Sequence, residues 1–385
     1  MAWMNKQLTF FDFFSGIGGF RIGLERAGFK CVGYCDNDKH ANKLYSNYFN
    51  TEEECFFNDI TTINTTELPD FDILCGGFPC QSFSIAGKRR GFEDTRGTMF
   101  FEVARILKDK KPKYFILENV KGLLNHDGGR TFQTILKILS DIGYKVQWQL
   151  LNSKFFGVPQ NRERVYIVGC YGDECIGKIF PISGASSKNS CTGPKGSVVY
   201  WKNSKEKWVN EERNEVGTIR TQSDLCRQPL LKQLDETKGK GQAHRIYDSS
   251  GIGSCLTANG GGQGGKAGLY YVKNGTKKGY DEARVGDGIS LAYPESKLRR
   301  GRVGRGCSQT LDTSCNMGTI DNYRIRRLTP LECFRLQGFP DDMVECGRKI
   351  GLVDGHLYKM AGNAVTVNVI EAVARKLAEV AYGTT

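Results

Sequence analysis

The chain has 385 residues, of which 39% are hydrophobic and 25% are charged, and its net charge is +12. These values are typical of a globular protein with one large domain or two modest ones. The sequence has no apolar run near the roughly 20 residues that a transmembrane helix needs. Its N-terminus lacks the apolar core of a signal peptide, so we expect a cytoplasmic protein with no membrane partner.

The excess positive charge is concentrated in one part of the chain. Residues 186–354 hold 28 lysines and arginines against 19 acidic residues, whereas the remainder holds 26 against 23. A basic segment of this kind is typical of a protein that binds a polyanion, although a solvated basic surface has the same composition. The 14 cysteines include no Cys-x-x-Cys pair, and there are only four histidines, so we expect no metal site.

The first half of the chain alternates strand-like and helix-like segments. Strand-like runs lie at residues 8–14, 31–34, 71–75, 114–118 and 164–169. Helix-like runs lie at residues 20–27, 99–108 and 132–140. This alternation predicts an α/β fold with a doubly wound, mostly parallel sheet.

The pattern changes near residue 182. Residues 251–306 contain 15 glycines in 56 positions, which is too many for regular helices. We expect a smaller domain of short strands and loops there. Helical patterns return at residues 328–339 and 367–380. The sequence therefore predicts one domain from residues 1–182 and 355–385, and a second from residues 183–354.

A glycine turn, Ser15-Gly-Ile-Gly-Gly19, joins the first strand to the first helix. Glycines let a ligand approach the backbone closely, and the helix N-terminus offers unpaired N–H groups. Asp36 ends the second strand, where a carboxylate can accept the hydroxyls of a ribose. The spacing differs from the Gly-x-Gly-x-x-Gly turn that binds dinucleotides, so it favours a nucleoside ligand. The alternative is a purely structural turn.

Two reactive side chains follow neighbouring strands. Cys80 lies in Gly-Gly-Phe-Pro-Cys-Gln, and Glu118 lies in Leu-Glu-Asn-Val. Open α/β sheets bind ligands at the carboxyl ends of their strands, so this placement indicates a nucleophile with an acid beside it. An inert buried cysteine and a surface glutamate are the alternatives. The polar segment 81–97, which carries three glycines, is typical of a lid.

Arg162 and Arg164 alternate with Glu163, so both would point to one face of a strand. Guanidinium groups in that position can hold a base or a phosphate. A solvated strand edge is the alternative.

In this order, the motifs resemble those of the bacterial and phage DNA (cytosine-5) methyltransferases of restriction–modification systems. The matching blocks are Phe-Ser-Gly-Ile-Gly-Gly, Phe-Pro-Cys-Gln, Glu-Asn-Val, Gln-Asn-Arg-Glu-Arg, Arg-Leu-Thr-Pro-Leu-Glu-Cys and Gly-Asn-Ala-Val, within residues 8–182 and 324–380. The motif pattern is closest to that of the GCGC-specific enzyme, but the target-recognition region of this chain is longer than that of the GCGC-specific enzyme. The resemblance implies a Rossmann-like methyltransferase fold. It also implies methyl transfer from S-adenosylmethionine to C5 of a flipped-out cytosine, with S-adenosylhomocysteine as the product.

The resemblance also implies roles for individual residues. The cofactor pocket would comprise Phe14, Gly16, Gly18, Gly19, Asp36, Asp59, Ile60, Pro79, Asn363 and Val365, with Phe14 against the adenine. Cys80 would attack C6 of the cytosine, which Glu118, Arg162 and Arg164 would hold. The implied DNA contacts are Gln81, Ser84, Lys88, Arg96, Gln242, Arg245, Thr257, Arg299, Arg302 and Arg305.

By the same resemblance, residues 1–182 and 355–385 form the catalytic, S-adenosylmethionine-binding domain, and residues 183–354 form the target-recognition domain. The expected partner is double-stranded DNA, bound by a monomer. The enzyme would belong to a restriction–modification system, with an endonuclease that forms no stable complex, or would be a phage or orphan methyltransferase. A tRNA cytosine-5 methyltransferase shares the catalytic blocks and is the alternative. The basic, glycine-rich insertion favours duplex DNA.

Overall fold

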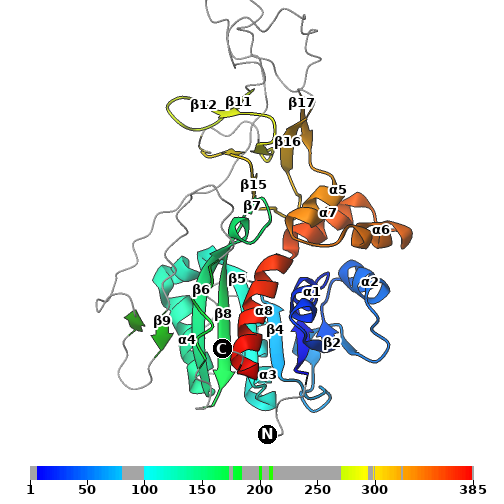
Figure 1. The fold of residues 1–385 in the computed structure, drawn as a ribbon, viewed down its shortest axis with the longest axis vertical. Helices are drawn as coiled ribbons and strands as arrows, with labels where there is room; N and C mark the ends of the chain where they lie inside the picture. The colour runs from blue at the N-terminus through cyan, green and yellow to red at the C-terminus, as the bar shows by residue number, and fades with distance from the viewer. Residues whose placement is uncertain are drawn as a thin grey trace, which may run out of the picture.

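The computed structural model describes residues 7–79, 99–172, 177–183, 199–201, 208–210, 270–293, 298, 300–321 and 324–383. Its largest element is a seven-stranded sheet of order β3-β2-β1-β4-β5-β8-β6 (Figure 1). The strands are β1 (Thr9–Phe13), β2 (Lys30–Cys35), β3 (Cys55–Phe57), β4 (Ile73–Gly77), β5 (Tyr114–Val120), β6 (Tyr144–Asn152) and β8 (Glu163–Tyr171).

Neighbouring strands from β3 to β5 pair in parallel, and only β8 runs antiparallel to both of its neighbours within this sheet. The predicted doubly wound, mostly parallel sheet is therefore confirmed. Sequence analysis missed β6, although Tyr144, Val146, Trp148 and Leu150 alternate there with polar residues.

Helices cover both faces of the sheet. They are α1 (Gly19–Arg26), α2 (Lys39–Tyr48), α3 (Met99–Lys110), α4 (Arg130–Asp141) and α8 (Val367–Tyr382). One face packs on α3 and α4 in a core that includes Phe11, Phe13 and Leu117. The other face packs on α1 and α8 around Phe10 and Ile116. Because successive strand residues point to opposite faces, the apolar runs of β1 and β5 supply both cores.

Three short helices, α5 (Pro330–Leu336), α6 (Asp341–Lys349) and α7 (Asp354–Asn363), form a cluster on the side of α2 (Figure 1). Their core contains Phe334, Met343 and Leu357 together with Leu44 of α2. The helix expected over residues 328–339 is shorter in the structure, because Gly338 adopts a φ of 80° that ends it. The boundary expected at residue 354 falls inside this helical cluster.

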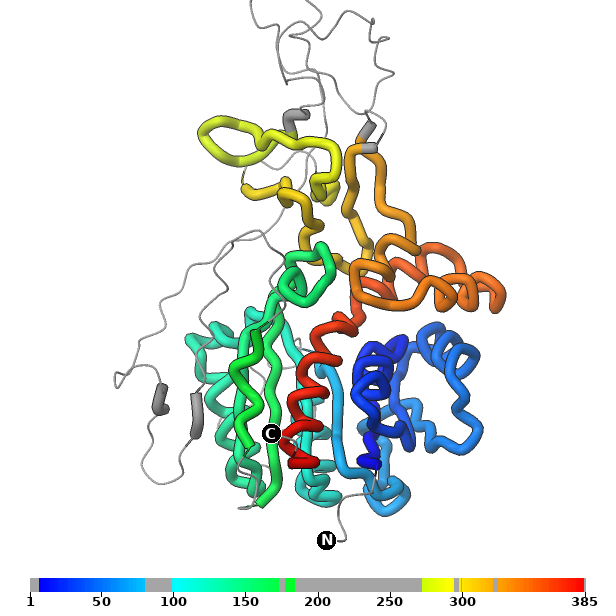
Figure 2. The backbone as a smooth tube through the Cα atoms, in the orientation of Figure 1, coloured from blue at the N-terminus to red at the C-terminus, as the bar shows by residue number. Residues whose placement is uncertain are grey.

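A second region of short strands lies beyond one edge of the sheet (Figure 2). It contains the hairpin of β11 (Tyr270–Lys273) and β12 (Tyr280–Ala283). It also contains an antiparallel sheet of β14 (Val303–Gly304), β13 (Gly288–Ser290), β16 (Met317–Asp321) and β17 (Arg324–Arg327). This outcome matches the expected domain of short strands and loops. A further hairpin pairs β9 (Val199–Trp201) with β10 (Trp208–Asn210).

One parallel pair of strands joins the two regions. β7 (Gln160–Asn161) precedes β8, and it pairs with β15 (Ser308–Gln309) of the second region. None of the helices that the structure describes has the length and apolar character needed to span a bilayer.

Candidate catalytic and cofactor site

The glycine turn follows β1 at the carboxyl edge of the sheet. Phe14 has a φ of 54° and Gly16 a φ of 53°, so the chain turns sharply as soon as the strand ends. A Cβ on Gly16 would meet no atom within 4 Å, so the backbone at Gly16 borders open space. Gly18 is the N-cap of α1, which begins at Gly19. The turn therefore presents bare backbone beside a helix N-terminus, as its sequence predicted.

Asp36 holds this turn in place. Its Oδ2 accepts a hydrogen bond from the Gly16 N–H (2.8 Å), and its Oδ1 accepts one from the Asp38 N–H (2.8 Å). Burial raises the pKa of Asp36, while these two backbone donors oppose the shift. The carboxylate therefore lies directly beside the open backbone of the turn, and its proposed contact with a ribose stays a prediction.

The remaining predicted cofactor residues lie on loops at the same edge. Asp59 caps the short 3-10 helix Ile60–Thr62 after β3, where its Oδ1 accepts the Thr61 N–H (2.9 Å). Pro79 follows β4 and is exposed. Asn363 ends α7, and Val365 precedes α8.

Val365 brings the C-terminal segment to the glycine turn. A Cβ on Gly19 would lie 2.7 Å from Val365 Cγ2, and one on Gly77 of β4 would lie 3.7 Å from Val365 Cγ1. Only glycine at position 19 permits this approach, since a real Cβ never sits that close to another carbon. Segments about 350 residues apart in the sequence thus form one edge of the site.

Glu118 and Arg164 form a buried ion pair on adjacent strands. Glu118 lies opposite Tyr166 and Val120 lies opposite Arg164, so Glu118 and Arg164 are diagonal neighbours on one face of the sheet. Arg164 Nε lies 3.0 Å from Glu118 Oε1, and the two side chains are 14% and 10% exposed. Oε1 accepts no well-aligned hydrogen bond from the residues that the structure describes.

A buried carboxylate oxygen without a hydrogen bond is unfavourable unless a ligand supplies one. Glu118 also lies at the carboxyl end of β5, beside the strand that leads to Cys80, and a Cβ on Gly77 would be 3.2 Å from its Oε2. The pair can therefore present a carboxyl group and a cation to one planar, polar ligand.

Asn119 is a site residue to which sequence analysis gave no role. Its side chain is buried, and its Nδ2 donates to the carbonyl oxygen of Phe78 (2.8 Å), two residues before Cys80. Its Oδ1 accepts the Val120 N–H (2.8 Å). The bond from Asn119 Nδ2 to Phe78 fixes the point where the chain leaves β4. The block Glu-Asn-Val contained the signal, because asparagine is unfavourable inside a strand unless its amide has partners.

Arg162 makes different contacts from Arg164. It lies in the one-residue break between β7 and β8, and its guanidinium group donates to the backbone carbonyls of Leu311, Gly362 and Ala364. The expected strand is therefore interrupted at Arg162, and the role of the two arginines in holding a base stays a prediction.

The expected DNA contact of Arg302 does not fit its position in the structure. Its side chain is 0% exposed, and Nη2 donates to the carbonyl oxygen of Tyr293 (2.9 Å). A side chain enclosed in this way cannot reach a DNA phosphate, so Arg302 has a structural role in the second region. Arg305, in contrast, is 62% exposed and lies 3.8 Å from Asp287, which leaves its outer surface open to a partner.

Several predicted residues lie outside the described part of the chain. They are Cys80, Gln81, Ser84, Lys88, Arg96, Gln242, Arg245, Thr257 and Arg299. Their roles stay predictions. Among the described residues, no three acidic, histidine or cysteine side chains are grouped as metal ligands would be.

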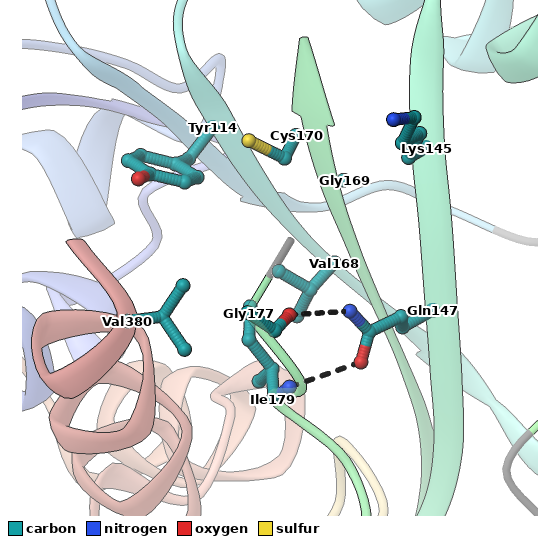
Figure 3. A pocket seen from close by; sticks show the side chains of 9 residues that line it. All are labelled: Tyr114, Lys145, Gln147, Val168, Gly169, Cys170, Gly177, Ile179 and Val380. Atoms are coloured by element: carbon teal, nitrogen blue, oxygen red, sulfur yellow. Dashed lines mark hydrogen bonds between the residues drawn. The ribbon is translucent and has the colours of Figure 1, made fainter. Parts of the chain in front are cut away.

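A small cavity of about 20 Å³ lies away from this edge (Figure 3). Its lining includes Tyr114 at the start of β5 and Val380 near the end of α8. The side chain of Gln147 also lines the cavity, where it accepts a hydrogen bond from the Ile179 N–H (3.0 Å) and donates one to the Gly177 carbonyl (3.0 Å). The volume is close to that of one water molecule, so we assign this cavity a structural role.

Known proteins of one family resemble the chain over nearly its whole length. Residues 8–379 match the family model described as C-5 cytosine-specific DNA methylase. The chain is 38% identical to the type II methyltransferase M.HpaII of Haemophilus parainfluenzae, covering 98% of this chain and 90% of that protein. It is 34% identical to the orphan methyltransferase M.SPRI of Bacillus phage SPR, covering 96% and 97% of the two chains. It is 33% identical to the type II methyltransferase M.HhaI of Haemophilus parahaemolyticus, covering 96% and 95%.

Solved structures show the same fold at lower identity. A Spodoptera frugiperda DNMT2 mutant superposes with a TM-score of 0.54 at 17% identity, over 96% of this chain and 99% of that one. The family match spans nearly the whole chain, including both the sheet edge and the C-terminal loop that meets it. The chain therefore belongs to the C-5 cytosine-specific DNA methylase family and is a DNA (cytosine-5) methyltransferase.

Proposed function

We propose that the chain transfers a methyl group from S-adenosylmethionine to C5 of a flipped-out cytosine in a specific sequence of duplex DNA. The observation that carries the proposal is the buried pair of Glu118 and Arg164. It lies at the carboxyl edge of the sheet, beside the strand that leads to Cys80 and near the glycine turn. An acid and a cation, at the edge toward which the chain leads to Cys80, suit a pyrimidine whose ring must gain and lose a nucleophile.

The residues at the glycine turn fit the proposed cofactor. Open space in front of Gly16 leaves room for a ligand against the backbone, and the Asp36 carboxylate beside it can accept ribose hydroxyls. The half-buried ring of Phe14 offers a surface for the adenine. The other residues that would line this pocket are Gly18, Gly19, Asp59, Ile60, Pro79, Asn363 and Val365. When bound, S-adenosylmethionine supplies an electrophilic methyl group.

In the mechanism that we propose, the thiolate of Cys80 adds to C6 of the cytosine. Glu118 donates a proton to ring N3 as negative charge develops there, and Arg164 holds the O2 carbonyl oxygen. The ring becomes an enamine, and its C5 is then nucleophilic enough to take the methyl group. A base, for which a water molecule suffices, then removes the C5 proton, and the released electron pair restores the double bond and expels the Cys80 thiolate. N3 returns its proton to Glu118. Only the thiolate can begin this sequence, because the neutral thiol is a poor nucleophile.

The target carbon lies inside the base stack, so the cytosine must first leave the helix. We propose that residues 183–354 bind the duplex, with Arg305 and Arg299 among the phosphate contacts and Gln242 entering the vacated position. The basic excess of this segment supports that role. Residues 1–182 and 355–385 would be the catalytic domain, in a monomeric, cytoplasmic enzyme. A restriction endonuclease of the same system would form no stable complex with it.

Methyl transfer assays on two substrates test this function. Tritiated S-adenosylmethionine is incubated with the protein and either plasmid DNA or transfer RNA, and bisulfite sequencing then locates the modified cytosines. We expect label in DNA, at one recurring short sequence. Label in transfer RNA alone would establish the RNA-modifying alternative instead.

A further inference from the structure

The guanidinium group of Arg162 is held by backbone carbonyls from two distant segments. Nη2 donates to the carbonyl oxygens of Gly362 (3.3 Å) and Ala364 (2.8 Å), and Nη1 donates to that of Leu311 (3.2 Å). The side chain is 3% exposed. Burial, reinforced by the charge of Arg164, lowers the pKa of Arg162 to about 10, so the group remains cationic at neutral pH. Burying a cation whose hydrogen-bond acceptors are all neutral carbonyl groups costs free energy of folding, so we expect Arg162 to have a specific role.

The two segments belong to different parts of the proposed enzyme. Gly362 and Ala364 flank Asn363 and precede Val365, in the loop that meets the glycine turn. Leu311 follows β15, the strand through which the second region joins β7. Arg162 thus connects the cofactor edge to the segment that leads into the DNA-binding region.

The backbones of the two segments touch at this point. A Cβ on Gly362 would lie 2.1 Å from the carbonyl oxygen of Asp312 and 2.7 Å from Cα of Thr313. No side chain fits between them, so a shift of either segment is transmitted to the other by direct contact.

Buried amides secure the same loop on its other side. Gln337 Nε2 donates to the Ala361 carbonyl (2.8 Å), and its Oε1 accepts the Thr366 hydroxyl (2.9 Å). Gln160 donates to the Leu336 carbonyl (2.8 Å) and accepts the Leu311 N–H (3.1 Å). Both glutamines are fully buried. Satisfied networks of this kind hold their members in one arrangement.

We propose that Arg162 is a positioning residue that couples cofactor binding to DNA binding, and that it does not hold the cytosine. The inference rests on the proposed function. Because one guanidinium group is bonded to both segments, ordering the loop at Gly362–Val365 also orders the segment at Leu311. DNA then binds to a region that has already lost part of its conformational freedom, so its affinity rises.

The test is a binding cycle with S-adenosylhomocysteine and a duplex that carries the sequence identified by bisulfite sequencing. Fluorescence anisotropy gives the Kd for DNA with and without a saturating amount of S-adenosylhomocysteine. For the unmodified protein we expect the ratio of these constants to be on the order of tenfold. In Arg162→Lys the ratio should fall to within about twofold of one, because a single ammonium group lacks the planar fork that reaches both segments.

Arg335→Lys is the matched control, because Arg335 lies on α5 in the adjoining helical cluster and is 56% exposed. It should keep the full ratio. Circular dichroism and thermal melting show whether each variant is folded. If Arg162→Lys does not fold, Gln337→Met removes two bonds of the same loop and should lower the ratio in its place.

Two results would overturn the inference. One is equal DNA affinity with and without S-adenosylhomocysteine in an unmodified protein that methylates DNA. That result would leave the proposed function intact. The other is a full ratio in folded Arg162→Lys. If that variant has also lost covalent capture of 5-fluorocytosine, Arg162 is a cytosine ligand after all. Failure of the unmodified protein to methylate duplex DNA would instead contradict the proposed function itself.

Discussion

At the scale of single residues, two arginines that are close in sequence make different contacts. Arg164 lies within β8 and pairs with Glu118, whereas Arg162 lies in the break between β7 and β8 and bonds to distant carbonyls. Their spacing in the sequence predicted that both face one site. It could not predict the carbonyl partners of Arg162, because these are 149 to 202 residues away.

Glu118→Gln tests the role of the acid. The substitution keeps the shape of the side chain but removes the proton that it would donate to N3. Methyl transfer should fall by about 10² to 10⁴-fold, the usual contribution of a general acid. Single-turnover rates with saturating DNA measure the loss. Affinity for duplex DNA should stay within a few-fold of the original, and an unchanged rate would show that Glu118 is not the acid.

Asp12 supplies a prediction about pH. It is fully buried in β1, and burial raises its pKa to about 8. Tyr45 and Cys75 donate weak hydrogen bonds to it (3.4 and 3.7 Å). Because its folded pKa lies above the unfolded value of about 4, its stabilising contribution is complete below pH ~4 and is lost as the pH rises through about 8.

Asp12→Asn should remove this decline in stability with rising pH, because the amide does not ionise. The free energy of unfolding of the original protein, relative to that of the variant, should decline between pH 5 and pH 8 by up to about 1.4 kcal/mol per pH unit. Denaturant titrations at several pH values measure it. The test is the slope of this free-energy difference against pH, because new contacts of the amide change the difference by the same amount at every pH. Parallel curves for the two proteins would mean that Asp12 ionises normally in the fold.

At the scale of whole elements, the sequence predicted most of the sheet. The expected strands and helices of the first half are all present, because apolar runs, amphipathic segments and glycine turns mark them clearly. Two further elements carried signals that were overlooked. These were the alternation of β6 and the N-cap of α2, where Asp38 accepts the His40 N–H (2.9 Å). The antiparallel course of β8 depends on pairing between distant strands, which local patterns do not determine.

Helix packing at the crossing of α1 and α8 supplies a second structural prediction. A Cβ on Gly23 would lie 2.7 Å from Ile370 Cβ and 2.9 Å from the backbone nitrogen of Glu371. Gly23→Ala should therefore destabilise the protein by about 1–3 kcal/mol through overpacking, less the ~1 kcal/mol that alanine contributes in a helix. Gly355→Ala in α7 is the control, because open space surrounds that position. Equal stability of the two variants would refute this account of the crossing.

At the scale of the whole molecule, two regions meet along β7, β15 and the loop before α8. The resemblance implied that Val365 shares a pocket with the glycine turn, and in the structure Val365 lies against Gly19, while the role of that pocket stays a prediction. The way in which the second region is attached was not predictable. It depends on one short parallel pair and on buried side chains whose partners lie far along the sequence.

The most direct test of the account is the covalent capture of Cys80. A duplex with 5-fluorocytosine at the modified position is incubated with the protein and S-adenosylmethionine, then denatured and digested for mass spectrometry. Fluorine cannot leave C5 as a proton does, so the adduct should persist on the peptide that contains Cys80, and Cys80→Ser should form none. Absence of the adduct from a protein that methylates the ordinary duplex, or an adduct on another residue, would contradict the central claim.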